Sequence, residues 1–281
     1  MKQFFKHFGS NRGAVVGSII IFVVALTGIS CSVLFENSPW MMVGQPLLLP
    51  FQNSDFPLGT DMLGRDIGAG LAYGARVSLL VGVVSTLVAV CVGILIGAAA
   101  GYYGGWVDDL MMRFTEFFQT IPQLAMAVVL VAILSPSIYS IVGAIALVSW
   151  PPVARLVRGE FLSLKQREFV QAAIVIGQRP RQIIFMQILP NAMSPIIVTA
   201  SLMIATAILT ESALSFLGLG DRNMMSWGFM IGASRTMLRE APWMSVMPGV
   251  AILLTVLAIN LIGEGLNDAM NPQLRKRGGD V

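Results

Sequence analysis

The sequence predicts an all-α membrane protein with about six transmembrane helices, and three observations support that fold class. Hydrophobic residues make up 56% of the 281 residues and charged residues only 12%, whereas soluble domains carry roughly 25% charged residues. The apolar residues fall into runs of about 20, enough to cross a hydrocarbon layer ~30 Å thick. A bilayer core holds no water to satisfy backbone amides, so such runs must be helices.

The six predicted spans follow one another along the chain at about 15–35, 77–100, 114–134, 138–154, 194–217 and 246–266. No small-residue cleavage site follows the first run, so we expect a retained helix and not a removable signal peptide. The segment 36–76 contains Pro39, Pro46, Pro50 and Pro57. Prolines interrupt a helix, so this segment is predicted to be a structured loop outside the membrane.

The distribution of positive charge predicts the orientation of the chain. Of the 18 Lys and Arg residues, 13 lie in the N-terminus and in 101–113, 155–190 and 267–281, and five lie in the opposite loops. Positive residues are retained in the cytoplasm, so both termini are expected to be cytoplasmic. This topology accounts for the net charge of +3 without a nucleic-acid partner. Cys31 and Cys91 lie in predicted spans and are expected to pack as small apolar residues, not to form a disulfide framework.

The segment 158–190 is long for a connection between neighbouring spans and has the pattern of a helix, a turn and a second helix. Ser163 and Gln166 suggest a capping-box start. Phe169, Ala172, Ala173 and Ile176 recur at helical spacing on one face. Gly177 suits the end of the first helix and Pro180 the start of the second. Two interpretations remain open, a docking surface for another protein or an amphipathic helix resting on lipid headgroups.

The order Gln171-Ala172-Ala173, then Gly177, then Leu189-Pro190 resembles the EAA loop of ABC-importer permeases. In that family the loop forms a coupling helix that places small residues in a groove of a cytoplasmic ATPase. The resemblance implies that the coupling residues are Glu168, Phe169, Gln171, Ala172, Ala173, Ile176, Gly177, Leu189 and Pro190. Gln171 stands where the family usually has Glu, so a carboxylate there is not essential to coupling in this chain.

Further motifs extend the resemblance over nearly the whole chain. They are LGTD at 58–61, GRD at 64–66, GARVSL at 74–79, GYYGG at 101–105, ESALSFLGLG at 211–220, SWG at 226–228 and the segment 260–272. Together they resemble the dipeptide, oligopeptide and nickel permease group. Residues 221–225 depart from the proline-rich stretch that is common there. This departure leaves the substrate open among dipeptides, longer peptides, glutathione, opine-like molecules and nickel chelates.

The resemblance implies the type I importer permease fold in a bacterial inner membrane. Residues 1–75 would hold the cytoplasmic N-terminus, the first transmembrane helix and the outward loop. Residues 76–266 would form the transmembrane core with the coupling loop 158–190, and 267–281 a cytoplasmic tail. The implied partners are a second related permease, two ATPase subunits, an extracytoplasmic solute-binding protein and the lipid bilayer. No cofactor is expected in this chain, because ATP and Mg would bind the ATPases.

Several polar and aromatic residues are candidates for special roles. Glu116 and Glu211 lie in or near apolar spans, where an ionised side chain is costly and marks a pathway candidate. The alternative is a hydrogen bond between helices. Asp61, Arg65 and Asp66 are expected to form a charge network that fixes the outward loop, in preference to binding a ligand. The tryptophans at 40, 227 and 243 are expected to anchor the chain at the membrane interface.

No intrinsic catalytic site is evident in the sequence. His7 is the single histidine, and the phosphate-binding motif G-x-x-x-x-G-K-[ST] is absent. We therefore expect a non-catalytic subunit, with ATP hydrolysed by another polypeptide. A proton-coupled secondary carrier using Glu116 and Glu211 is the alternative function, which the helix–turn–helix segment disfavours. An intramembrane enzyme would need a cluster of reactive side chains that the sequence lacks.

Overall fold

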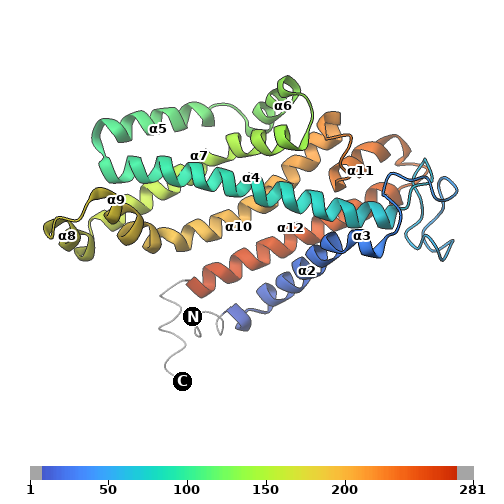
Figure 1. The fold of residues 1–281 in the computed structure, drawn as a ribbon, viewed down its shortest axis with the longest axis horizontal. Helices are drawn as coiled ribbons and strands as arrows, with labels where there is room; N and C mark the ends of the chain where they lie inside the picture. The colour runs from blue at the N-terminus through green and yellow to red at the C-terminus, as the bar shows by residue number, and fades with distance from the viewer. Residues whose placement is uncertain (1–7, 271–281) are drawn as a thin grey trace.

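The computed structural model describes residues 8–270, which form an elongated helical bundle (Figure 1). The α-helices are α2 (Arg12–Ile29), α3 (Cys31–Leu34), α4 (Ile67–Tyr103), α5 (Gly105–Gln119), α6 (Gln123–Leu134), α7 (Ile138–Lys165), α8 (Glu168–Val175), α9 (Pro180–Gln182), α10 (Leu189–Leu214), α11 (Trp227–Ser234) and α12 (Trp243–Met270). Two π-helical segments, η1 (Ile183–Ile188) and η2 (Ser215–Leu219), flank α10, and a 3-10 turn, η3 (Arg235–Met237), follows α11. Residues 8–270 contain no β-strand, which confirms the all-α prediction.

Five helices are long and apolar enough to cross a membrane, and α5 with α6 would make a sixth, bent span. The prediction of a continuous third span over 114–134 is wrong, because α5 and α6 meet at an angle of 82°. Pro122 causes this break, since proline lacks the amide hydrogen and restricts the residue before it to extended conformations. His7 and most of the tail predicted at 267–281 lie outside the described residues.

Several predicted boundaries differ from the structure. Helix α2 ends at Ile29, before the predicted 35, and the short α3 follows. Helix α4 begins at Ile67, so the outward loop ends ten residues earlier than 76. Helix α7 continues to Lys165, well past the predicted end at 154. Hydropathy locates only the apolar part of a helix, so it missed the start of α4 and the end of α7, which continue as helix beyond the apolar runs.

Helices α4 and α7 form the most extensive helix pair among residues 8–270, and glycines make their close approach possible. Gly93, Gly97 and Gly101 recur every four residues on one face of α4. A Cβ atom added at Gly97 would lie 2.8 Å from the Cβ of Val157 on α7. One at Gly101 would lie 2.6 Å from the Cβ of Phe161. Small residues at such positions let two membrane helices pack backbone to backbone.

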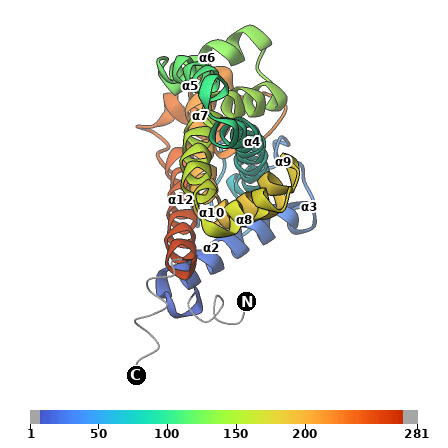
Figure 2. The same cartoon turned by 90° about the vertical axis from the view of Figure 1, so that its left-hand side faces the viewer.

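The bundle has two distinct ends. Helices α8 and α9 form one of them, at the left of Figure 1, and are seen from the front in Figure 2. The loop 35–66 and α11 form the opposite end, at the right of Figure 1. We call these the α8 end and the α11 end. Helices α2 and α12 pack side by side, and Asn11 Nδ2 donates to Asp268 Oδ2 at 3.0 Å.

Candidate functional site

At the α8 end, a short helix projects from the long helices. Helix α8 starts after Arg167, so the predicted capping-box start at Ser163 is wrong, because Ser163 lies inside α7. The predicted stop is confirmed: Gly177 has φ = 80°, a conformation that glycine adopts without strain. Pro180 begins α9, as predicted. The helix predicted over 163–177 is therefore shortened to the eight residues of α8.

The buried and exposed sides of α8 do not match the face predicted from the sequence spacing. Ala173 is only 5% exposed and packs with Val170 into the hydrophobic cluster between α4, α7 and α10, so its assignment to the exposed face is wrong. Phe169 and Ala172 lie on the opposite, exposed face. Val175 and Ile176 are 86% and 78% exposed at its C-terminal end. The apolar surface opposite the buried residues is formed by Phe169, Ala172, Val175 and Ile176, and we call it the α8 apolar face.

A chain of hydrogen bonds connects α8 to the ends of two long helices. Gln171 Nε2 donates to the backbone oxygen of Lys165, the last residue of α7, at 2.8 Å. Lys165 Nζ donates to the backbone oxygen of Tyr102 at the end of α4, at 2.5 Å. The same ammonium lies 5.4 Å from the centre of the Tyr102 ring. A displacement of α8 would thus act on α7 and α4 together.

The remaining residues of the EAA-like segment lie around this connection. Glu168 is exposed in the first turn of α8, where its charge suits the helix N-terminus. Leu189 is partly buried against the same cluster as Ala173. Pro190 is exposed in the first turn of α10. These two residues therefore position the start of α10 and do not extend the α8 apolar face.

At the α11 end, Glu211 is enclosed by serines. It is 2% exposed, and its Oε1 accepts from Ser215 Oγ at 2.8 Å and from Ser226 Oγ at 2.7 Å. Ser226 Oγ also accepts from the backbone amide of Phe229 at 3.0 Å and so caps α11. Glu211 thus holds α11 against α10, which agrees with the hydrogen-bond alternative, while its Oε2 is buried without a hydrogen-bond partner among residues 8–270.

Trp227 lies inside the bundle and not at a membrane interface, so its predicted role as an interfacial anchor is wrong. It is 2% exposed. Its Nε1 donates to the backbone oxygen of Leu71 at 3.0 Å, and its backbone amide donates to Ser78 Oγ at 3.3 Å. Gly74 leaves room for the ring, because an added Cβ there would lie 2.7 Å from it. The two hydrogen bonds of Trp227 and the packing of its ring against Gly74 therefore hold α11 on α4.

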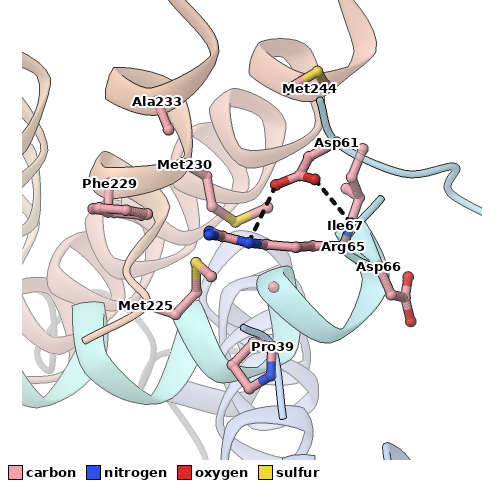
Figure 3. A pocket seen from close by; sticks show the side chains of 11 residues that line it. Pro39, Asp61, Arg65, Asp66, Ile67, Met225, Phe229, Met230, Ala233 and Met244 are labelled. Atoms are coloured by element: carbon pink, nitrogen blue, oxygen red, sulfur yellow. Dashed lines mark hydrogen bonds and ion pairs between the residues drawn. The ribbon is translucent and has the colours of Figure 1, made fainter. Parts of the chain in front are cut away.

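The three charged residues of the outward loop separate into a pair and a helix cap (Figure 3). Asp61 lies 3.9 Å from Arg65 Nε, and its Oδ1 accepts the backbone amide of Arg65 at 2.8 Å. The Arg65 guanidinium lies 5.1 Å from the centre of the Trp40 ring. Asp66 points away from this pair and caps α4 by accepting the amide of Gly68 at 2.8 Å. Burial raises the pKa of Asp66, and hydrogen bonds from backbone amides oppose part of that rise.

Glu116 lies on the exposed surface of α5, facing an open groove between α5 and α7. Glu211 does not line that groove. The two acids therefore do not form the relay that a proton-coupled carrier would need. No group of three or more His, Cys, Asp or Glu residues suited to a metal occurs among residues 8–270.

The sequence interpretation missed Val175 and the arginines of the groove, Arg113 and Arg155. A predicted helix that started at 168 instead of 163 would have placed Val175 in the last turn, at the exposed end of the helix. Asp109 and Arg113 lie just before the predicted span 114–134 and precede Glu116 by seven and three residues, a helical spacing of charges that indicates a polar face.

Comparison with known proteins agrees with this geometry. Residues 93–276 match the family model described as binding-protein-dependent transport system inner membrane component. The chain is 41% identical to a dipeptide transport system permease protein of Alkalihalophilus pseudofirmus, over 98% of this chain and 90% of the relative. It is 37% identical to an oligopeptide transport system permease protein of Haemophilus influenzae, over 98% of this chain and 88% of the relative.

A solved structure shares the fold at low sequence identity. A chain of the MetNI methionine ABC transporter, in an inward-facing conformation, superimposes with a TM-score of 0.59 at 16% identity. The match covers 72% of this chain and 97% of that one. The family match and the full-length relatives together lead to one assignment. The chain belongs to the family of inner-membrane components of binding-protein-dependent transport systems.

Proposed function

We propose that this chain is a non-catalytic permease subunit of an ATP-driven importer that moves short peptides delivered by a binding protein. The observation that carries the proposal is the α8 apolar face, which is exposed on a short helix outside the long helices. Exposed apolar groups on a projecting helix are typical of a docking surface. The dipeptide and oligopeptide permeases among its relatives support peptides as the substrate class.

The proposed mechanism transmits ATPase movement through α8. Two ATPase subunits bind ATP and Mg, and this chain needs no cofactor of its own. When an ATPase pulls α8, the bonds from Gln171 to Lys165 and from Lys165 to Tyr102 pass the displacement to α7 and α4. A second, related permease completes the pathway. Directional transport requires that substrate affinity differ between the inward-facing and outward-facing arrangements.

The proposed orientation places α8 and both termini in the cytoplasm, and the loop 35–66 and α11 toward the binding protein. The excess of Lys and Arg near α8 supports it. Single cysteines can test it in a chain whose Cys31 and Cys91 are replaced by serine. In intact spheroplasts, an impermeant thiol reagent should label Asp55→Cys at once and Arg167→Cys only after permeabilisation. Labelling of Arg167→Cys in intact spheroplasts would reverse the topology.

Reconstitution tests the function itself. The four kinds of subunit would be assembled in liposomes, with radiolabelled dialanine as the probe. We expect uptake that requires both ATP and the binding protein, and no nucleotide hydrolysis by this chain alone. ATP hydrolysis by the contaminant-free chain, or uptake driven by a proton gradient without ATP, would contradict the proposed division of labour.

A further inference from the structure

The groove between α5 and α7 is a polar feature on a largely apolar chain. Its volume is about 710 Å³, within the range of roughly 300–1,000 Å³ that is usual for small-molecule sites. Asp109, Arg113 and Glu116 line it from α5, and Arg155 and Arg158 line it from α7. The spacing of four and then three residues puts the α5 side chains on one face of that helix.

Two contacts between the helices bracket the groove. Arg158 donates two hydrogen bonds to the Asp108 carboxylate, at 2.5 and 2.6 Å. About three turns further along α5, Arg155 Nη1 donates to Gln119 Oε1 at 3.0 Å. These contacts hold α5 against α7 at two levels. Between the two levels, the side chains of Arg113 and Glu116 make no hydrogen bond or ion pair with any residue in 8–270.

The groove is not suited to face lipid. Glu116 lies roughly 17 Å along the helix axis from Gly105, at 1.5 Å per residue. A charged side chain placed in the hydrocarbon costs about 2.5–3.5 kcal/mol on insertion scales, so such residues normally face a water-filled cavity or a protein interior. No residue in 8–270 covers Arg113 or Glu116, so this face is open to water or to another subunit.

The signs of the charges indicate what the groove can hold. Asp108 neutralises Arg158, which leaves Arg113, Arg155, Asp109 and Glu116 as two cations and two anions. A site for an anion would carry more basic than acidic side chains, and a site for a metal ion would carry more acidic than basic side chains. A balanced groove is complementary to a molecule that carries one positive and one negative end.

We propose that the groove is a binding site for the charged termini of a short zwitterionic peptide on its way through the membrane. Arg113 and Arg155 face the terminal carboxylate, and Glu116 faces the terminal ammonium. Asp109 limits the attraction of the arginines for anions. This balance suits a transport pathway, where binding must be strong enough for entry and weak enough for release. The inference rests on the proposed importer function and adds the substrate contacts.

The test uses the full transporter in liposomes, with radiolabelled dialanine as the probe and two readouts, uptake and ATP hydrolysis stimulated by the binding protein. Arg113→Gln and Glu116→Gln should each lower uptake per ATP hydrolysed by about tenfold. Stimulated hydrolysis should stay close to wild type, because α8 is untouched. Arg12→Gln, which removes an exposed arginine at the start of α2, is the matched control and should leave the ratio unchanged.

A charge exchange separates a peptide site from a set of fixed ion pairs with the second permease. The double variant R113E/E116R keeps one cation and one anion on the same face of α5. A peptide can bind in the reverse direction, so uptake per ATP should recover to within about threefold of wild type. Fixed partners would instead meet like charges, and the loss would deepen.

Two results would overturn the inference. One is an unchanged uptake ratio in both single variants. The other is loss of complex assembly on size-exclusion chromatography with no recovery in the double variant, which would make the groove an interface between subunits. Failure of the wild-type complex to take up dialanine and to hydrolyse ATP with the binding protein would instead contradict the proposed function itself.

Discussion

The surroundings of Glu211 and Trp227 at the α11 end differ from the α8 apolar face in how far their side chains are enclosed. At the α11 end, the Glu211 carboxylate accepts from two serines, and Trp227 is enclosed with its indole hydrogen bonded. At the α8 end, Val175 and Ile176 are more than three-quarters exposed. The packing around Glu211 and Trp227 thus stabilises the chain itself, whereas the α8 apolar face is left free for a partner. Substitutions of Glu211 and Trp227 should change the stability of the chain. Substitutions on the α8 apolar face should change its assembly with the ATPases.

The largest expected effect is at Trp227. Trp227→Ala removes a buried ring and its hydrogen bond to Leu71, and large-to-small changes of this kind cost about 3–5 kcal/mol. Thermal unfolding of the detergent-solubilised chain would measure the loss. Trp106→Ala is the matched control, because Trp106 is 75% exposed near the α8 end. Equal destabilisation by the two variants would contradict the comparison.

Two neighbouring alanines on α8 lie on its buried and its exposed side. Ala173→Trp forces a large ring into the cluster around Val170 and should destabilise the chain by about 1–3 kcal/mol or more. Ala172→Trp points outward and should leave the melting temperature unchanged while weakening ATPase binding. Both variants would be compared by thermal unfolding and by co-purification with the ATPases. A stable Ala173→Trp variant would show that the buried face of α8 has been assigned incorrectly.

An intermediate effect is expected at Glu211. Glu211→Ala leaves the hydroxyls of Ser215 and Ser226 without their buried acceptor, at a cost of about 1–3 kcal/mol. Glu211→Gln keeps an oxygen that can accept from both serines, so its loss should be smaller. Thermal unfolding of the two variants measures the difference. If Glu211→Ala were as stable as wild type but inactive in transport, Glu211 would belong to the pathway and not to the packing of α11.

The smallest effect is expected at Asp66, the cap of α4. Asp66→Ala removes the cap and should cost about 1 kcal/mol, whereas Asn caps nearly as well as Asp. Burial raises the pKa of Asp66 above 3.8, so its carboxylate becomes less favourable to folding as the pH rises through that raised pKa. The stability of Asp66→Asn relative to wild type should therefore increase as the pH rises through the raised pKa of Asp66. A constant difference would contradict the burial argument.

The sequence predicted the long helices well, because an apolar run in a membrane must satisfy its backbone locally. It did not predict which face of α8 is buried. That outcome depends on where α7 ends and on contacts with Val170 and Ala173 that come from distant helices. The enclosure of Trp227 was missed for the same reason, since its hydrogen-bond partners lie more than 140 residues away. Gly177 was predicted correctly, because a helix stop depends on local backbone conformation.

The docking role of α8 can be tested by a single substitution on the α8 apolar face. Ile176→Asp places a charge on the α8 apolar face at a position that is 78% exposed, so the chain should fold with an unchanged melting temperature. Co-purification with the ATPase subunits should fall by about tenfold or more, because a desolvated, unpaired charge is costly in an interface. Normal co-purification, together with normal ATP-dependent uptake of dialanine, would contradict the claim that α8 couples this chain to its ATPases.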